Sequence, residues 1–210
     1  MDMGRSLFIS FEGIDGCGKS TQIRLLNEYL KGKGYDVLLT REPGGSVISE
    51  KIRAMLLDKA NSDMTDVTEA LLYAAARDQL VNTVIIPALE EGKIVLCDRF
   101  VDSSEAYQGF GRRLGSEYIL DINRRILDHL PDITFYFKLT PEEAQRRISN
   151  MKRDTDRLEE AGISFFERTN EGFNTIAERD SNRIVTLNAG DTIENIHQKI
   201  TDIVDDYLNR

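Results

Sequence analysis

Residues 7–20, LFISFEGIDGCGKS, hold the pattern that decides the fold. The first five residues form a short apolar run, which is typical of a strand buried in a parallel sheet. Residues 13–20, GIDGCGKS, then match the phosphate-binding loop pattern G-x-x-x-x-G-K-[ST]. Residues 19–31 place apolar side chains on one helical face, so the match lies in the strand, loop and helix context that the pattern requires.

Each residue type in this loop has a physical role. Glycines let the backbone turn around a phosphate with its N–H groups pointing inward. Lys19 is expected to reach the β and γ phosphates, and Ser20 to hold Mg²⁺. The alternative is a glycine-rich turn without a ligand. We expect ATP or GTP binding by Gly13, Ile14, Asp15, Gly16, Cys17, Gly18, Lys19, Ser20 and Thr21.

Outward from the loop, apolar runs alternate with stretches of helical period. Further strands are expected at 36–40, 94–97, 133–139 and 184–187. Helices are expected at 46–57, 66–91 with a bend near Pro87, 117–130, from Pro141, and at the end of the chain. The strand at 36–40 is too apolar for a solvent-facing edge. Strands separated by helices predict a three-layer α/β/α fold with a five-stranded parallel sheet.

The length and charge of the chain limit the number of domains and the kinds of partner that we expect. The chain has 210 residues, 40% of them hydrophobic and 30% charged, which suits one globular domain over residues 1–210. A net charge of −9 repels nucleic acid, so no nucleic-acid partner is expected. Two cysteines and no apolar stretch of membrane-spanning length predict a cytoplasmic protein without a membrane contact. The charged residues from about 148 to 160 predict a mobile lid.

The residues that follow the strand at 94–97 indicate which class of phosphate-binding-loop protein this is. GTPases carry an N-K-x-D motif, and the chain has no Asn-Lys pair. Motor ATPases usually follow this strand with Asp-Glu, but here Asp98 and Arg99 follow it. Asp98 suits a Mg²⁺ shell, and the Arg99 fork suits a second phosphate, which indicates transfer to a phosphorylated acceptor. The alternative for Arg99 is pairing with a surface carboxylate.

Six segments together carry a resemblance that runs from about Leu7 to the C-terminal helix. They are FEGIDGCGKSTQ, TREPGG, LLYAAARDQ, CDRFVDSSEAYQGFGR, DRLEE and FFERT, in that order. In sequence and spacing they resemble the thymidylate kinase family, whose fold is that of nucleoside monophosphate kinases. The resemblance implies transfer of the γ-phosphate of ATP to dTMP, giving dTDP, with Mg²⁺. It also implies a homodimer, for which residues 66–80 are a candidate interface.

The resemblance further implies how the acceptor is held around its sugar and phosphate. Asp15 would accept a hydrogen bond from the 3′-hydroxyl of the deoxyribose. Arg77 and Arg99 would clamp the acceptor phosphate, with Arg41 adding positive charge. Tyr107 would press against the sugar 2′ carbon and so disfavour ribonucleotides.

The base contacts follow from the same resemblance. Tyr73 stands where the family usually has a Phe stacked on thymine, although core packing would also suit it. Ser104 and Gln108 would meet the edge of the ring. Arg53 would meet its O4, although a solvated helix position is the alternative.

The lid would supply catalytic charge, because Gly16 and Cys17 stand where some members of the family have an arginine. The candidates are Arg147, Lys152, Arg153 and Arg157, with Arg153 and Arg157 ranked first. The alternative is a solvated charged helix.

Direct in-line transfer is expected. The acceptor phosphate has a second pKa of about 6, so at neutral pH its oxygen is already an anionic nucleophile. Two other functions stay open. One is a kinase for another nucleoside or nucleotide, and the other is an ATP-dependent switch without catalysis.

Overall fold

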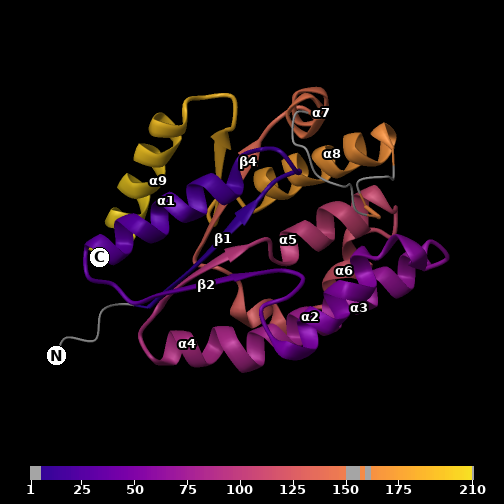
Figure 1. Cartoon of the computed structure of the whole chain (residues 1–210), viewed down its shortest axis with the longest axis horizontal. Helices are drawn as coiled ribbons and strands as arrows, with labels where there is room; N and C mark the ends of the chain where they lie inside the picture. The colour runs from indigo at the N-terminus through magenta and orange to yellow at the C-terminus, as the bar shows by residue number, and fades with distance from the viewer. Residues whose placement is uncertain (1–5, 150–156, 159–161, 210) are drawn as a thin grey trace.

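The computed structural model describes residues 6–149, 157–158 and 162–209. Within them, five parallel strands form one sheet in the order β2-β3-β1-β4-β5 (Figure 1). The strands are β1 (Leu7–Glu12), β2 (Val37–Arg41), β3 (Ile94–Asp98), β4 (Ile133–Lys138) and β5 (Ile184–Asn188). Because all of them run in one direction, their carboxyl ends meet at one edge of the sheet, where ligands bind in open α/β folds.

Helices connect successive strands. The α-helices are α1 (Lys19–Gly32), α2 (Val47–Leu57), α3 (Asp66–Leu80), α4 (Ile86–Glu90), α5 (Val101–Ser104), α6 (Ser116–Ile122), α7 (Pro141–Ser149), α8 (Ile163–Arg179) and α9 (Ile193–Leu208). Turns of 3₁₀-helix form η1 (Lys59–Asn61) and η4 (Arg124–His129), and π-helical segments form η2 (Val81–Ile85) and η3 (Glu105–Gly111).

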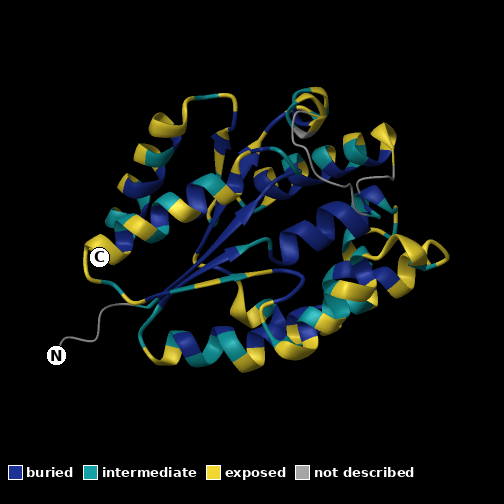
Figure 2. Cartoon of the chain, in the orientation of Figure 1, coloured by how far each residue is buried: buried dark blue, intermediate teal, exposed yellow. Residues whose placement is uncertain are grey.

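The helices cover both faces of the sheet. Leu7 and Ile9 of β1 join the apolar cluster that contains residues of α1 and α9. Phe8, between them, joins the cluster of η2 and α4 on the other face. Figure 2 shows the central strands β1, β3 and β4 as a buried layer between helices whose outer sides are exposed. This is the predicted three-layer α/β/α fold, and among the described residues no helix is long and apolar enough to span a membrane.

Three local predictions need correction. β2 is an edge strand, paired with β3 alone, and Leu39 on it is 46% exposed. Its apolar residues therefore do not exclude an edge, because helices cover much of a parallel sheet from its faces.

The expected helices at 66–91 and 117–130 are each divided. The first passes through the π-helical segment η2 ahead of Pro87, whose missing N–H and bulky ring disturb the preceding helical bonds. The second becomes α6 and then η4, with the break at Asn123. The buried Asn123 amide donates to the carbonyl of Ile119 and accepts from Arg77, so a tertiary contact fixes this break.

Candidate active site

A cavity of about 380 Å³ lies at the carboxyl ends of the strands, next to the phosphate-binding loop. The structure brings fifteen of the predicted site residues to its wall. They are Asp15, Gly16, Gly18, Lys19, Ser20, Thr21, Arg41, Arg53, Tyr73, Arg77, Asp98, Arg99, Ser104, Tyr107 and Gln108. They come from the loop after β1, the start of α1, the ends of β2 and β3, and from α2, α3, α5 and η3.

The phosphate-binding loop fits between β4 and the start of α1. Gly13 has a φ of 139°, and a Cβ there would lie 2.8 Å from the carbonyl oxygen of Phe137. Lys19 is buried, and its Nζ donates to the carbonyls of Gly13 at 2.9 Å and Ile14 at 3.4 Å. Ser20, on the first turn of α1, is exposed. Gly13, Ile14 and Cys17 shape the loop without lining the cavity.

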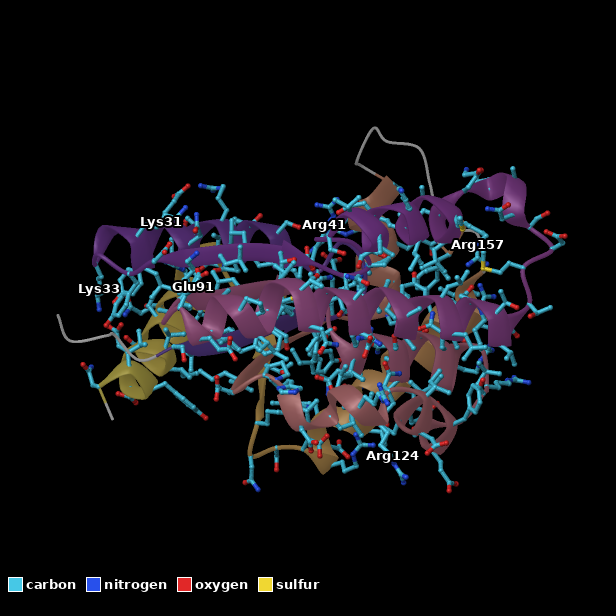
Figure 3. All side chains as sticks on the ribbon, turned by 90° about the horizontal axis from the view of Figure 1, so that it is seen from below. Lys31, Lys33, Arg41, Glu91, Arg124 and Arg157 are labelled. Atoms are coloured by element: carbon cyan, nitrogen blue, oxygen red, sulfur yellow. The ribbon has the colours of Figure 1, made fainter. Side chains whose placement is uncertain are left out.

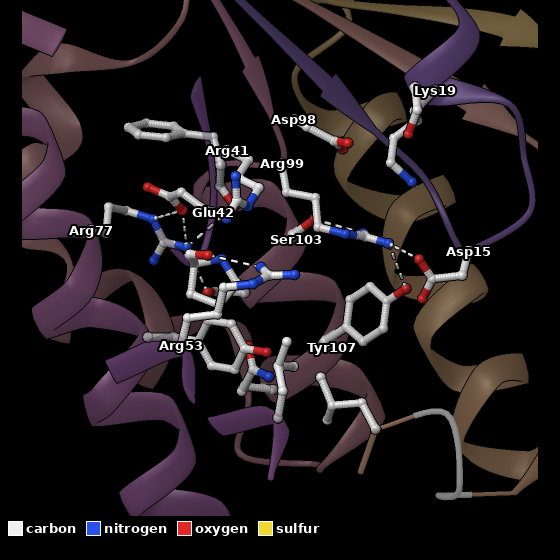
Figure 4. A pocket seen from close by; sticks show the side chains of 18 of the residues that line it. Asp15, Lys19, Arg41, Glu42, Arg53, Arg77, Asp98, Arg99, Ser103 and Tyr107 are labelled. Carbon is white, nitrogen blue, oxygen red and sulfur yellow. Dashed lines mark hydrogen bonds and ion pairs between the residues drawn. The ribbon is translucent and has the colours of Figure 1, made fainter. Parts of the chain in front are cut away.

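Arg99 connects the loop to the rest of the cavity. It directly follows β3 and has a left-handed φ of 71°, which is uncommon for a residue with a side chain. Its Nη1 donates to the Gly13 carbonyl at 2.9 Å, and its Nη2 donates to Asp15 Oδ1 at 2.9 Å and to the Tyr107 hydroxyl at 3.3 Å. Figure 4 shows Arg99 reaching from Asp98 toward Asp15, with Tyr107 beside both.

A buried carboxylate supports this arginine. Ser103 accepts a hydrogen bond from Arg99 Nη1 and donates one to Glu12, which also accepts from the backbone N–H of Phe100. Burial and the charge of Asp102 together raise the pKa of Glu12 to about 8, although the hydrogen bonds from Ser103 and Phe100 and the charge of Arg99 oppose this shift. Arg99 is therefore bound by Ser103, which Glu12 holds in place, as well as by groups that line the cavity.

Arg77 lies deeper than a phosphate clamp would. It is 1% exposed, and its Nη2 lies 2.6 Å from Glu42 Oε2. The same guanidinium donates to Asn123 Oδ1 at 2.9 Å and to Ser104 Oγ at 2.8 Å. Burial raises the pKa of Glu42 to about 7, although the Arg77 charge opposes this shift. The structure thus brings Arg77 to the cavity wall and engages its donors with protein atoms.

Two other arginines keep more of their donors available. Arg41, at the end of β2, is exposed and pairs with Glu50 at 3.0 Å. Arg53, on α2, donates from Nη1 to the Pro43 carbonyl at 2.8 Å. Both line the same cavity as Arg77 and Arg99, so four arginines from separate segments lie on its wall.

The predicted base contacts Tyr73, Ser104 and Gln108 line the cavity together with Tyr107, which was predicted to contact the sugar. Arg53, the remaining predicted base contact, lines it from α2. Tyr73 comes from α3, and Ser104, Tyr107 and Gln108 come from the adjoining α5 and η3. All four are buried, and the Tyr107 ring also lies 5.0 Å from the Arg99 guanidinium. The helical segment formed by α5 and η3 was not predicted from the sequence.

Neither Arg147 nor Arg157, the two predicted lid arginines that the structure describes, lines the cavity beside the phosphate-binding loop. Arg147 donates to Glu143 and to the carbonyl of Ala189, each at 3.0 Å, and lies outside the cavity wall. Arg157 donates to the carbonyl of Leu56 at 2.9 Å and to Glu69 Oε2 at 2.6 Å. Figure 3 shows Arg157 toward the opposite end of the molecule from Lys33. Lys152 and Arg153 lie outside the described residues.

The predicted metal ligands share the cavity with the loop. Asp98 Oδ1 is buried and has no hydrogen-bond partner among the described residues, and Ser20 lines the same cavity. The described chain contains no cluster of three His, Cys, Asp or Glu side chains suited to a metal. Ser20 and Asp98 therefore fit a Mg²⁺ ion that takes most of its ligands from water and phosphate, as this ion usually does.

Several cavity residues carried no prediction. Glu42, Pro43, Leu57, Phe100, Ser103 and Leu158 complete the wall. Glu42 and Ser103 lie inside the motifs TREPGG and DRFVDSS, so their position in those motifs was an available signal. Glu69, which binds Gln108 and Arg157, had no such signal, because an acidic residue in the first turn of a helix is ordinary.

A phosphate-binding loop that shares one cavity with several arginines is the arrangement of a P-loop nucleotide kinase. Comparisons with known proteins define the family. The thymidylate kinase family profile matches residues 11–200. A thymidylate kinase of Thermoanaerobacter sp. is 49% identical over 96% of this chain and 98% of its own length. One of Geobacillus sp. is 50% identical over 90% and 91%.

A solved structure agrees with these sequence matches. The crystal structure of thymidylate kinase from Ehrlichia chaffeensis superimposes with a TM-score of 0.78 at 33% identity, covering 95% of this chain and 98% of that one. The chain belongs to the thymidylate kinase family.

Proposed function

We propose that this protein transfers the γ-phosphate of ATP to dTMP and so forms dTDP. The observation that carries the proposal is Arg99, whose guanidinium joins Gly13 and Asp15 of the phosphate-binding loop to Tyr107 of η3. A bidentate guanidinium at this position suits the transfer of a phosphoryl group from one phosphate to another. Relatives named thymidylate kinase, about half identical over nearly the whole chain, support dTMP as the acceptor. We place the reaction in the cytoplasm, since both cysteines are free.

Lys19 would bind the donor phosphates after its Nζ leaves the carbonyls of the loop. Ser20 and Asp98 would hold Mg²⁺, which when bound offsets the charge on the phosphates. The loop N–H groups at the start of α1 would bind the same anions. These groups would draw the two phosphates together by reducing their repulsion.

The acceptor would lie across the rest of the cavity. Asp15 would accept from the 3′-hydroxyl, Tyr107 would crowd the 2′ carbon and Tyr73 would stack on the base. We assign the acceptor phosphate to Arg99, with Arg41 and with Arg53, for which the resemblance implied the base O4. The guanidinium groups of Arg41 and Arg53 make fewer hydrogen bonds to described residues than that of Arg77 does. Arg77 would instead act at the base edge, because it already donates to Ser104.

Phosphoryl transfer to dTMP needs well-positioned substrates and positive charge, and it needs no general base. The dTMP phosphate is largely a dianion at neutral pH, so its oxygen can attack directly. Arg153 is the proposed lid donor of charge to the moving phosphoryl group. Arg157 would anchor the lid, since its fork is bound by Leu56 and Glu69. We also propose that residues 1–210 form one domain whose lid spans about residues 148–160.

We propose a homodimer through α2 and α3, which pack against each other. Val47, Ile48, Met55, Val67 and Leu71 on these two helices are exposed apolar residues. Such a patch favours an interface. In size-exclusion chromatography with light scattering, we expect twice the chain mass, and the monomer mass for Leu71→Glu.

The test of function is ADP release with ATP, Mg²⁺ and each of dTMP, dUMP, UMP, CMP, dGMP, GMP and AMP. We expect a strong preference for dTMP and a fall of about 10²-fold or more in kcat/KM for Arg99→Ala. Arg24→Ala, an exposed arginine of α1, is the matched control. A preference for another monophosphate would contradict dTMP as the acceptor. ADP release at the same rate with every monophosphate would indicate an ATPase or a switch.

A further inference from the structure

Glu69, on α3, joins three segments that are far apart in the sequence. Its side chain is 1% exposed. It accepts hydrogen bonds from Gln108 Nε2 at 2.9 Å, from Arg112 Nη2 at 3.0 Å and from Arg157 Nη2 at 2.6 Å. Two arginines therefore match its charge, while its third partner is a neutral amide that lines the active-site cavity.

That contact fixes which way the amide of Gln108 faces. An ionised carboxylate only accepts hydrogen bonds, so the NH₂ group of Gln108 must turn toward Glu69. The carbonyl Oε1 then turns away, and it has no hydrogen-bond partner among the described residues. Because Gln108 lines the cavity, the amide presents an acceptor there and withholds its donor.

Ser104 lies one helical turn before Gln108, and its hydroxyl presents a donor where the Gln108 amide presents an acceptor. Its Oγ accepts from Arg77 Nη2 at 2.8 Å, and it donates to no group among the described residues. The wall thus offers a donor from Ser104 beside an acceptor from Gln108. The thymine edge carries the O4 acceptor next to the N3–H donor, whereas cytosine carries an NH₂ donor next to an N3 acceptor.

We propose that Glu69 is a positioning residue that sets the choice of acceptor base through the Gln108 amide. The proposal rests on the proposed function and deepens it. Glu69 touches no substrate. It makes the base pocket complementary to an imide edge, shared by thymine and uracil, and mismatched to cytosine.

The test compares kcat/KM for dTMP with that for dCMP in the wild type and in Glu69→Gln. A glutamine at position 69 accepts or donates, so the Gln108 amide is free to turn over. We expect the dTMP/dCMP ratio to fall at least about tenfold, since a site that pairs an N–H strongly rejects an analogue without it. Glu105→Gln is the matched control, because Glu105 is equally buried, is bound by Arg179 and lies outside the cavity wall.

A double-mutant cycle tests that Glu69 acts through Gln108. In a Gln108→Ala background, Glu69→Gln should change the ratio less than about twofold. If circular dichroism shows that Glu69→Gln is unfolded, Glu69→Asp keeps the charge and withdraws the acceptor by one methylene, and the ratio should still fall.

Two results would overturn this inference while leaving the proposed function intact. One is a folded Glu69 variant with the wild-type ratio, and the other is an equal fall in Glu105→Gln. A wild type that does not use dTMP would overturn the proposed function itself.

Discussion

The two ends of the active-site cavity are built in different ways. At the base end, Arg77 and Glu69 are buried and cross-linked to Glu42, Ser104 and Gln108 by short hydrogen bonds and ion pairs. At the phosphate end, Lys19 binds loop carbonyls, Ser20 is exposed and Asp98 keeps an oxygen without a partner among the described residues. At the base end most polar atoms of Arg77 and Glu69 are bound by other protein atoms, although Glu42 Oε1 and Gln108 Oε1 have no partner among the described residues. More of the phosphate end is left for ligand atoms to complete.

The difference follows from what each end recognises. A neutral base edge is distinguished by the direction of a few hydrogen bonds, so the groups that read it must be held still. Phosphates arrive with several negative charges and attract cations from looser positions. Mutations at the base end should therefore affect both stability and specificity, and those at the phosphate end should affect catalysis with little effect on stability.

The largest expected effect is on stability, at Arg77. Arg77→Met leaves Glu42 buried without its partner, which costs about 3–5 kcal/mol of unfolding free energy. Urea unfolding followed by circular dichroism measures this cost. Arg146→Met is the control, because its exposed ion pair with Glu143 is screened by solvent and should contribute little to stability. A similar cost for both variants would show that the base end is no more tightly built than the surface.

The next effect is on catalysis, at Lys19. Lys19→Ala should lower kcat by about 10²–10³-fold, because one preorganised cation near the moving phosphoryl group is lost. The unfolding free energy should change by less than about 1 kcal/mol, since Lys19 donates only to loop acceptors. Lys31→Ala on the same helix is the control. Strong destabilisation by Lys19→Ala would contradict the contrast between the two ends.

A further effect on stability depends on pH and is spread over several pH units, at Glu12. Its pKa is about 8 in the folded chain and 4.5 ordinarily, so the unfolded chain releases this proton at lower pH. This group therefore lowers the unfolding free energy as pH rises from about 4.5 to 8, with a slope of up to about 1.4 kcal/mol per pH unit. Denaturation curves for Glu12→Gln should lack this contribution. Parallel pH profiles for the variant and the wild type would contradict it.

The phosphate end was readable from the sequence because its geometry is local. Eight consecutive residues between a strand and a helix make the loop, and Asp98 and Arg99 directly follow a strand. Local pattern alone was enough to place Lys19, Ser20 and Arg99 around one cavity.

The base end was less readable because its contacts are not local. The segment α5–η3 is buried nearly all round, so it lacks the polar face that marks an amphipathic helix. Gly111 in it allows a close approach to Phe165 that no single-sequence pattern shows. The partners of Arg77 and Glu69 come from distant segments, so the sequence predicted that Arg77 lies in the site but not that its donors are engaged.

The most direct test of the account is the melting temperature with dTMP and without ATP or Mg²⁺. A ligand that binds only the folded state must raise this temperature, and a base end that the protein has already built should bind dTMP alone. We predict a concentration-dependent rise with dTMP that is clearly larger than the rise with dCMP at the same concentration. No rise with dTMP, or equal rises with both, would contradict a preformed thymine site.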